Sequence, residues 1–145
     1  MTEIPDTSTT WSLFLKVHAV LLEKIEAALK QAGLPPLAWY DVLWALESAP
    51  EQRLRMHELA SHMVLSRSNL TRLVDRLEEA GLARREASPD DGRGACAAIS
   101  AKGLALRKKM WPVYQACIAN LFNGHIPAGT RLMLQKALRS VLEGN

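Results

Sequence analysis

Apolar residues recur every three to four positions along most of this chain, which is the spacing of one face of an α-helix. The pattern predicts six helices, at residues 9–32, 37–48, 56–64, 66–80, 100–123 and 127–143. The segment at 37–48 has almost no polar side, so we expect this helix to be covered on both sides. Short apolar runs bounded by turn residues predict strands at 53–55, 82–86 and 95–99.

The predicted helix at residues 66–80 has its start, its inner face and its end marked in the sequence. Ser66 is placed to cap the N-terminus, Leu70 and Leu77 lie on the inner face, and Gly81 follows as a C-terminal stop. Outward or flanking positions near its start carry hydrogen-bond donors: Arg67, Ser68, Asn69, Thr71, Arg72 and Arg76. The acidic residues crowd the second half, so we expect the N-terminal half to approach a phosphate backbone.

A solvated amphipathic helix is the alternative interpretation of this segment. In that case Arg72 and Arg76 would pair with Asp75 and Glu79, each of which lies three residues further along the helix. The neighbouring elements favour the first interpretation, because two helices joined by a short turn and followed by a hairpin form a winged helix-turn-helix. In that motif the second helix enters a major groove of DNA.

The predicted hairpin supplies a second set of candidate DNA contacts. Arg93 lies near the tip of its loop, and Asp91 is spaced to hold the guanidinium extended toward a narrow minor groove. The alternative for this pair is an ion pair that stabilises the turn. Arg84 and Arg85 on the first strand are candidates for phosphate contacts.

Composition permits an acidic partner without requiring one, because 145 residues carry a net charge of +3. A chain of this length is most simply one compact unit. Its basic residues between Gln31 and Ala101 are eight arginines and no lysine. Arginine can grip a phosphate or a guanine edge with two hydrogen bonds, although a GC-rich genome would also enrich it.

Other classes of function find little support in the sequence. We find no phosphate-binding glycine loop, nucleophile elbow or metal-ligand motif, so we expect no enzyme, cofactor or metal. Cys96 and Cys117 are expected to be structural thiols. The first ten residues do not form a signal peptide, and no apolar stretch approaches the roughly 20 residues of a membrane span. These features predict a soluble cytoplasmic protein.

The run LSRSNLTRLVDRLEEAGLARREASPDDGRGACAAISAKG closely resembles the recognition helix, wing and following helix start of the MarR family of transcription regulators. Its most specific element is the aspartate-x-arginine of Asp91 and Arg93. Ile99 and Ser100 depart mildly from the leucine and threonine usual in the family. The resemblance implies a mainly α fold with a small β-hairpin wing. A winged helix-turn-helix would span residues 35–99, with dimerisation helices at 1–34 and 100–145.

The resemblance further implies a homodimer that binds a pseudo-palindromic operator in double-stranded DNA, acts as a repressor and is released by a small-molecule effector. The wide apolar stripes of the first, fifth and sixth helices agree with a dimer. Effectors of the family are often phenolic or anionic and bind between the dimer helices and the winged domain. The candidates here are His18, Trp39, Tyr40 and Trp44, for which core packing is the alternative.

A winged-helix module that binds protein instead of DNA is the alternative function. Such a module would present exposed aromatic or aliphatic anchors. The helix at 66–80 instead presents Ser68, Asn69 and Arg72. The sequence therefore favours a winged-helix module that binds DNA over one that binds protein.

Overall fold

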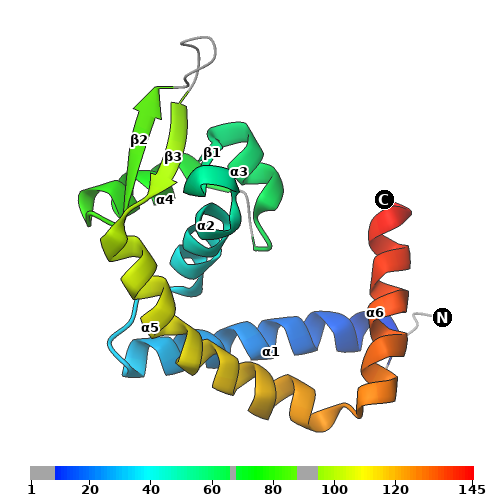
Figure 1. The fold of residues 1–145 in the computed structure, drawn as a ribbon. Helices are drawn as coiled ribbons and strands as arrows, with labels where there is room; N and C mark the ends of the chain where they lie inside the picture. Colours follow the sequence, from blue (N-terminus) through cyan, green and yellow to red (C-terminus); the bar gives the residue numbers. More distant parts are fainter. Residues whose placement is uncertain (1–8, 66–67, 88–94) are drawn as a thin grey trace, which may run out of the picture. The chain divides into compact units, whose positions relative to one another are not determined.

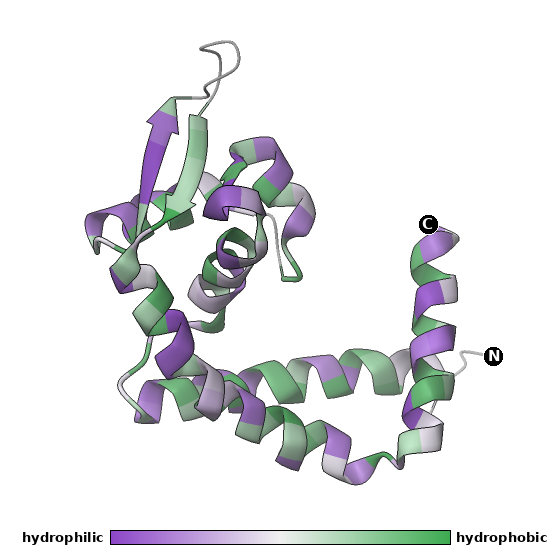
Figure 2. Ribbon diagram, in the orientation of Figure 1, coloured by the Kyte–Doolittle hydropathy of each residue, from purple (hydrophilic) through white to green (hydrophobic). Residues whose placement is uncertain are grey.

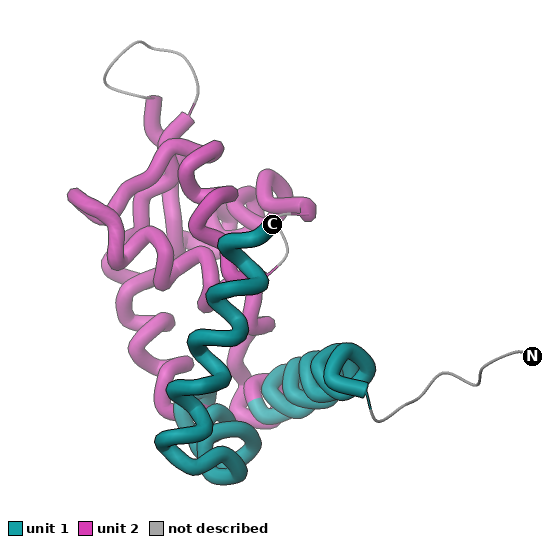
Figure 3. The backbone as a smooth tube through the Cα atoms, turned by 90° about the vertical axis from the view of Figure 1, so that its right-hand side faces the viewer, with its two compact units in different colours: residues 1–28, 114–145 teal, residues 29–113 magenta. Residues whose placement is uncertain are grey.

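The computed structural model describes residues 9–65, 68–87 and 95–145, which are drawn as a ribbon in Figure 1. The chain divides into two compact units, residues 1–28 with 114–145 and residues 29–113 (Figure 3). This division follows packing within the chain. The functional boundaries expected at residues 34 and 100 stay a prediction.

The predicted order of helices and strands is confirmed. The helices are α1 (Thr10–Gln31), α2 (Leu37–Ser48), α3 (Met56–His62), α4 (Leu70–Glu79), α5 (Ala101–Cys117) and α6 (Ala128–Glu143). The strands are β1 (Arg53–Arg55), β2 (Ala83–Ala87) and β3 (Ala95–Ile99). Shorter segments are the 3-10 turns η1 (Pro50–Gln52) and η3 (Asn123–His125) and the π-helical η2 (Ile118–Phe122). The long helix expected to reach residue 123 therefore leaves α geometry after Cys117.

Side-chain oxygens cap two of the helix N-termini. Thr9 Oγ1 accepts a hydrogen bond from the Ser12 N–H at 3.1 Å ahead of α1. Ser100 Oγ accepts one from the Gly103 N–H at 3.0 Å ahead of α5. Each bond satisfies a backbone donor that the first turn of a helix leaves without an intrahelical partner.

Glycine ends α4 as the sequence predicts. Gly81 has a φ of +75°, a left-handed conformation that glycine adopts without steric cost. The chain then turns back, so that the Leu82 N–H donates to the Leu77 carbonyl at 2.8 Å and the Gly81 N–H donates to Glu78 at 2.9 Å. This pattern is a Schellman motif, and it directs the chain from α4 into β2.

The start of α4 differs from the prediction. The helix begins at Leu70 with Asn69 at its N-cap, so the expected start at Ser66 is wrong by about one turn. Asn69 adopts a left-handed conformation with φ 61°, which asparagine tolerates better than most residues. Among the described residues of the segment, which begin at Ser68, Leu70 is the first that is buried. Ser66 itself lies outside the described residues.

The unit formed by residues 29–113 has a three-stranded antiparallel sheet in the order β1–β3–β2. Alternation along the strands places Leu54, Ala83 and Ile99 on one face of the sheet, where they join the main hydrophobic core. Helices α2, α3 and α4 supply the large fully buried side chains of that core, which are Val42, Leu43, Leu46, Leu59, Val74 and Leu77. The expectation that α2 is covered holds for most of its length, but Trp44 remains 48% exposed.

The unit formed by residues 1–28 and 114–145 is helical and rich in exposed apolar side chains. Helix α6 has no buried residue. On α1, Trp11 is 68% exposed, and on α6 Met133 and Leu142 are 71% and 77% exposed. Figure 2 shows the corresponding hydrophobic bands along both helices. A single chain leaves these faces uncovered.

Within the described residues, no helix combines the length and the hydropathy that crossing a bilayer would require.

Candidate nucleic-acid interface

Helix α4 has one buried face and one exposed face. Leu70, Val74 and Leu77 point into the core and are at most 8% exposed. Thr71, Arg72 and Arg76 lie on the opposite, exposed face, and Ser68 and Asn69 are exposed just ahead of the helix. The donor-bearing residues that the sequence singled out within the described part therefore share one surface.

Asp41 fixes the chain that leads into this surface. Its carboxylate accepts hydrogen bonds from the Val64 N–H at 3.0 Å and from the Leu65 N–H at 2.9 Å. Asp41 is 8% exposed and is the one buried charged residue among those the structure describes. Burial raises the pKa of Asp41, and the two backbone hydrogen bonds partly oppose this shift. Helix α2 thereby anchors the turn between α3 and α4.

Arg85 anchors the helix itself. Its Nη1 forms an ion pair with Asp75, and its Nη2 donates to the Thr71 carbonyl at 3.0 Å. The backbone N–H of Arg85 also donates to Glu78 Oε2 at 2.7 Å. One ion pair and two hydrogen bonds from this single residue of β2 therefore hold α4 against the strand.

These bonds change the charge of the exposed face. Asp75 would repel phosphates if it were free, but it forms an ion pair with the Arg85 guanidinium. Glu78 keeps its charge, and the backbone N–H of Arg85 holds its carboxylate toward β2. Arg72 and Arg76 form no ion pair with another described residue, so the pairing expected for a solvated helix is not found there. The result is a surface with two available guanidinium groups and several hydroxyl and amide donors.

Arg84 lies on the other face of β2 and has a different environment. Its Nε donates to Glu86 Oε1 at 2.7 Å, while Arg53 Nη1 lies 3.1 Å from Glu86 Oε2. The hydrogen bond from Arg84 lowers the pKa of Glu86. Successive side chains of a strand point to opposite faces of the sheet, so Arg84 and Arg85 are expected to point in opposite directions. The prediction that both arginines contact phosphates did not take this alternation into account.

The remaining predicted DNA contacts, Ser66, Arg67, Asp91 and Arg93, lie outside the described residues. Their roles, and the phosphate contacts of Arg84 and Arg85, stay predictions.

Among the predicted effector residues, Tyr40 and Trp44 belong to one cluster on α2 and α5. Tyr40 stacks on Trp111 with ring centroids 6.1 Å apart, and the Arg107 guanidinium lies 5.1 Å from the Trp44 ring. Arg107 also pairs with Glu47 at 2.9 Å. Burial raises the pKa of Tyr40, and its hydrogen bond with Arg107 opposes the shift. The sequence reasoning missed Arg107 and Trp111, although their spacing along one helix places them on adjacent turns.

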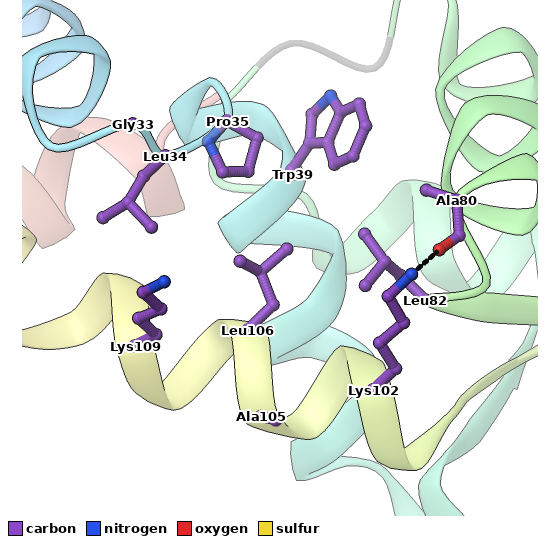
Figure 4. A pocket seen from close by; sticks show the side chains of 10 residues that line it. All are labelled: Gly33, Leu34, Pro35, Trp39, Ala80, Leu82, Lys102, Ala105, Leu106 and Lys109. Atoms are coloured by element: carbon purple, nitrogen blue, oxygen red, sulfur yellow. Dashed lines mark hydrogen bonds between the residues drawn. The ribbon is translucent and has the colours of Figure 1, made fainter.

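Trp39 points elsewhere, into an open groove with a volume of about 660 Å³ (Figure 4). The groove lies within residues 29–113, between α2, α5 and the turn after α4. It is lined by Gly33, Leu34, Pro35, Trp39, Ala80, Leu82, Lys102, Ala105, Leu106 and Lys109. His18 is exposed on α1, in the other unit of the chain.

The described residues contain no group of three or more histidine, cysteine or acidic side chains arranged to hold a metal ion. Cys96 is buried in β3 and Cys117 is half-buried, and both are free thiols.

Comparison with known proteins gives consistent matches. A family model described as MarR family matches residues 32–94. The chain is 32% identical over 118 residues to the HTH-type transcriptional repressor Mb2911 of Mycobacterium bovis, an alignment covering 81% of the chain and 83% of that protein. It is 30% identical over 109 residues to the repressor IacR of Pseudomonas putida, of whose length it spans 64%.

Two solved structures from Streptomyces coelicolor match nearly the whole chain. AbsC, a MarR family transcriptional regulator, superposes with a TM-score of 0.87 and 30% identity, covering 99% of this chain and 97% of AbsC. Sco3205, a regulator of the same family solved in complex with DNA, superposes with a TM-score of 0.88 and 26% identity. That match covers 99% of this chain and 91% of Sco3205.

Proposed function

The chain belongs to the MarR family of transcription regulators, and from this premise we propose that it is a cytoplasmic repressor that binds a pseudo-palindromic operator as a homodimer. Helix α4 enters the major groove, with Arg72 and the donors near the helix start reading base edges. Arg76 and the wing contribute phosphate contacts.

The observation that carries this proposal is the exposed face of α4. Its arginines are free of ion pairs within the described structure, and the acid nearest to them, Asp75, is paired with Arg85. A protein-binding face would instead concentrate aromatic or aliphatic anchors. On the exposed side of α4 we find Thr71, Arg72 and Arg76.

The homodimer is supported by the exposed apolar side chains of α1 and α6. Trp11, Phe14, Leu132 and Leu142 are each about half exposed or more in one chain. A patch of this kind on a soluble protein marks an interaction surface, and a two-fold axis lets the same patch cover itself. Dimerisation would present two α4 helices to successive major grooves.

We propose that an aromatic small molecule releases the dimer from DNA by favouring a conformation with the wrong spacing between its two α4 helices. The aromatic clusters on α2 and α5 support such a ligand, because Tyr40, Trp44 and Trp111 combine ring surfaces with the polar groups of Arg107. His18 remains a further candidate.

The proposal is tested by selecting bound fragments from genomic DNA and footprinting the strongest. We expect protection of an inverted repeat whose half-sites lie about one helical turn apart. A purified protein that enriches no sequence, or that protects a site without dyad symmetry, would refute it.

A further inference from the structure

Asn69 occupies the N-cap of α4, but its side chain does not cap the helix. Its backbone carbonyl accepts the first hydrogen bond of the helix, from the Leu73 N–H at 2.9 Å. The side-chain oxygen of an N-cap asparagine ordinarily accepts a further bond from the first turn, and no such bond forms here. Asn69 is exposed, as are Thr71 and Arg72. Within the described part of the chain, its carboxamide therefore keeps a donor and an acceptor available on the exposed side of α4.

Tertiary contacts before and after Asn69 restrain its backbone. Leu70, the next residue, is 8% exposed and belongs to the main core. Ahead of Asn69, the Asp41 carboxylate accepts hydrogen bonds from the N–H groups of Val64 and Leu65. The position of the carboxamide is thus largely set before any ligand arrives, which reduces the entropy lost on binding.

A carboxamide matches one base edge of the major groove. Adenine presents N7 as an acceptor and its N6 amino group as a donor, and an asparagine amide can bond to both at once. Guanine presents two acceptors on the same edge, which suit the guanidinium group of Arg72 instead. These two exposed side chains therefore match different purines.

We propose that Asn69 is a specificity-determining residue that reads one adenine in each half-site of the operator. The inference rests on the proposed function, because it requires α4 to enter the major groove. The competing explanation is that asparagine stands here only because it tolerates the left-handed backbone, with φ 61°, better than most residues do.

Variants that keep this backbone separate the two explanations. Asn69→Gly removes the carboxamide, while glycine adopts a positive φ without steric cost. Asn69→Asp keeps the size of the side chain but replaces the amide donor with a second acceptor. Gln52→Gly is the matched control, because Gln52 is also exposed with a positive φ of 56° but lies in η1 instead of at the start of α4.

Each full-length protein is used to select bound duplexes from a randomised library at fixed salt. We expect the wild type and Gln52→Gly to select the same operator, and both Asn69 variants to lose the preference for one adenine in each half-site. Arg72→Ala should relax a different position. Thermal unfolding of each variant shows whether a loss reflects misfolding. An operator recovered unchanged with Asn69→Gly would overturn the proposal and leave Asn69 with a backbone role only.

Modified bases test the contact at single atoms. At the selected adenine, 7-deazaadenine removes the N7 acceptor, and unsubstituted purine removes the N6 amino group. Each should weaken wild-type binding about three- to tenfold in fluorescence anisotropy, which is the loss of one hydrogen bond. Neither should weaken Asn69→Gly, which has no such bond to lose.

Equal losses in the wild type and in Asn69→Gly would refute the contact. A selected operator without an adenine that depends on Asn69 contradicts this inference and leaves the proposed function standing. A protein that selects no sequence at all contradicts the proposed function as well.

Discussion

At the scale of single residues, neighbouring arginines of β2 perform different tasks. Arg85 bonds to Asp75, Thr71 and Glu78 and fixes α4, whereas Arg84 shares Glu86 with Arg53 on the opposite face of the sheet. Residue type alone suggested one role for both. The bonding partners distinguish Arg85, which positions α4, from Arg84, which pairs with Glu86 on the other face of the sheet.

We predict that Arg85→Ala lowers the free energy of unfolding by about 1–2 kcal/mol, because it removes both the ion pair with Asp75 and the hydrogen bond to the Thr71 carbonyl. Arg84→Ala should change it by less than about 0.5 kcal/mol, as expected for an exposed pair. Urea denaturation measures both. Equal destabilisation by the two variants would contradict the assignment.

Asp41 gives a prediction about pH. Its pKa is raised in the folded state, so the folded protein binds this proton more tightly than the unfolded chain does. The contribution of Asp41 to stability therefore falls as the pH rises from the ordinary value of 3.8 through the folded pKa. Asp41→Asn does not titrate. We expect the free energy of unfolding of the wild type, minus that of Asp41→Asn, to decline over this range, and a rise would contradict the account.

At the scale of elements, the first turn of α5 is packed directly on the turn between α4 and β2. A Cβ atom added to Gly103 would lie 2.1 Å from the Leu82 carbonyl oxygen and 2.8 Å from Ile99 Cγ1. Both neighbours are buried, and one is backbone. The close approach also lets the start of α5 bond to the end of α4, where Ser100 Oγ donates to the Gly81 carbonyl at 2.6 Å and Lys102 Nζ donates to the Ala80 carbonyl at 2.9 Å.

Gly103→Ala should therefore destabilise the protein by about 1–3 kcal/mol through overpacking. Gly129→Ala on α6 is the control, because its added Cβ meets no atom within 4 Å. Alanine at that helical position should be neutral or slightly stabilising. Thermal unfolding of the two variants distinguishes them, and a neutral Gly103→Ala would show that this contact can relax.

Most elements could be predicted from sequence because periodicity and end signals agreed. Helix α2, the strands and the glycine stop after α4 follow from local pattern. The start of α4 could not be predicted in this way, because both Ser66 and Asn69 are good capping residues. Burial of Leu70 and the tie of Asp41 to Val64 and Leu65 are tertiary contacts that favour the later start.

The sequence was sufficient to predict that the candidate DNA-binding face of α4 carries exposed hydrogen-bond donors. It was not sufficient to predict which arginine pairs with which acidic residue. That Arg85 rather than Arg72 neutralises Asp75 depends on how β2 packs beside α4. The groove lined by Lys102 and Lys109 likewise joins segments distant in sequence. Neither contact can be inferred from the spacing of residues along the chain.

At the scale of the whole molecule, the proposed function requires two copies of the chain. The exposed apolar residues of α6 include Leu132 and Leu142, which are 60% and 77% exposed. We predict that the wild type has about twice its chain mass of 16.1 kDa in light scattering. The double variant Leu132→Glu/Leu142→Glu should be monomeric and bind operator far more weakly.

Lys136→Glu on the same helix adds negative charge without removing an apolar group, and it should remain dimeric. A double variant that keeps the mass of the wild type would place the dimer interface elsewhere.

The central claim is that the exposed face of α4 reads DNA sequence, and it is tested most directly by the ratio of affinities for operator and for a scrambled duplex, measured by fluorescence anisotropy at fixed salt. For Arg72→Ala we predict that operator binding weakens by about 1–3 kcal/mol while scrambled binding changes less, so the ratio falls. A ratio equal to that of the wild type would contradict the account.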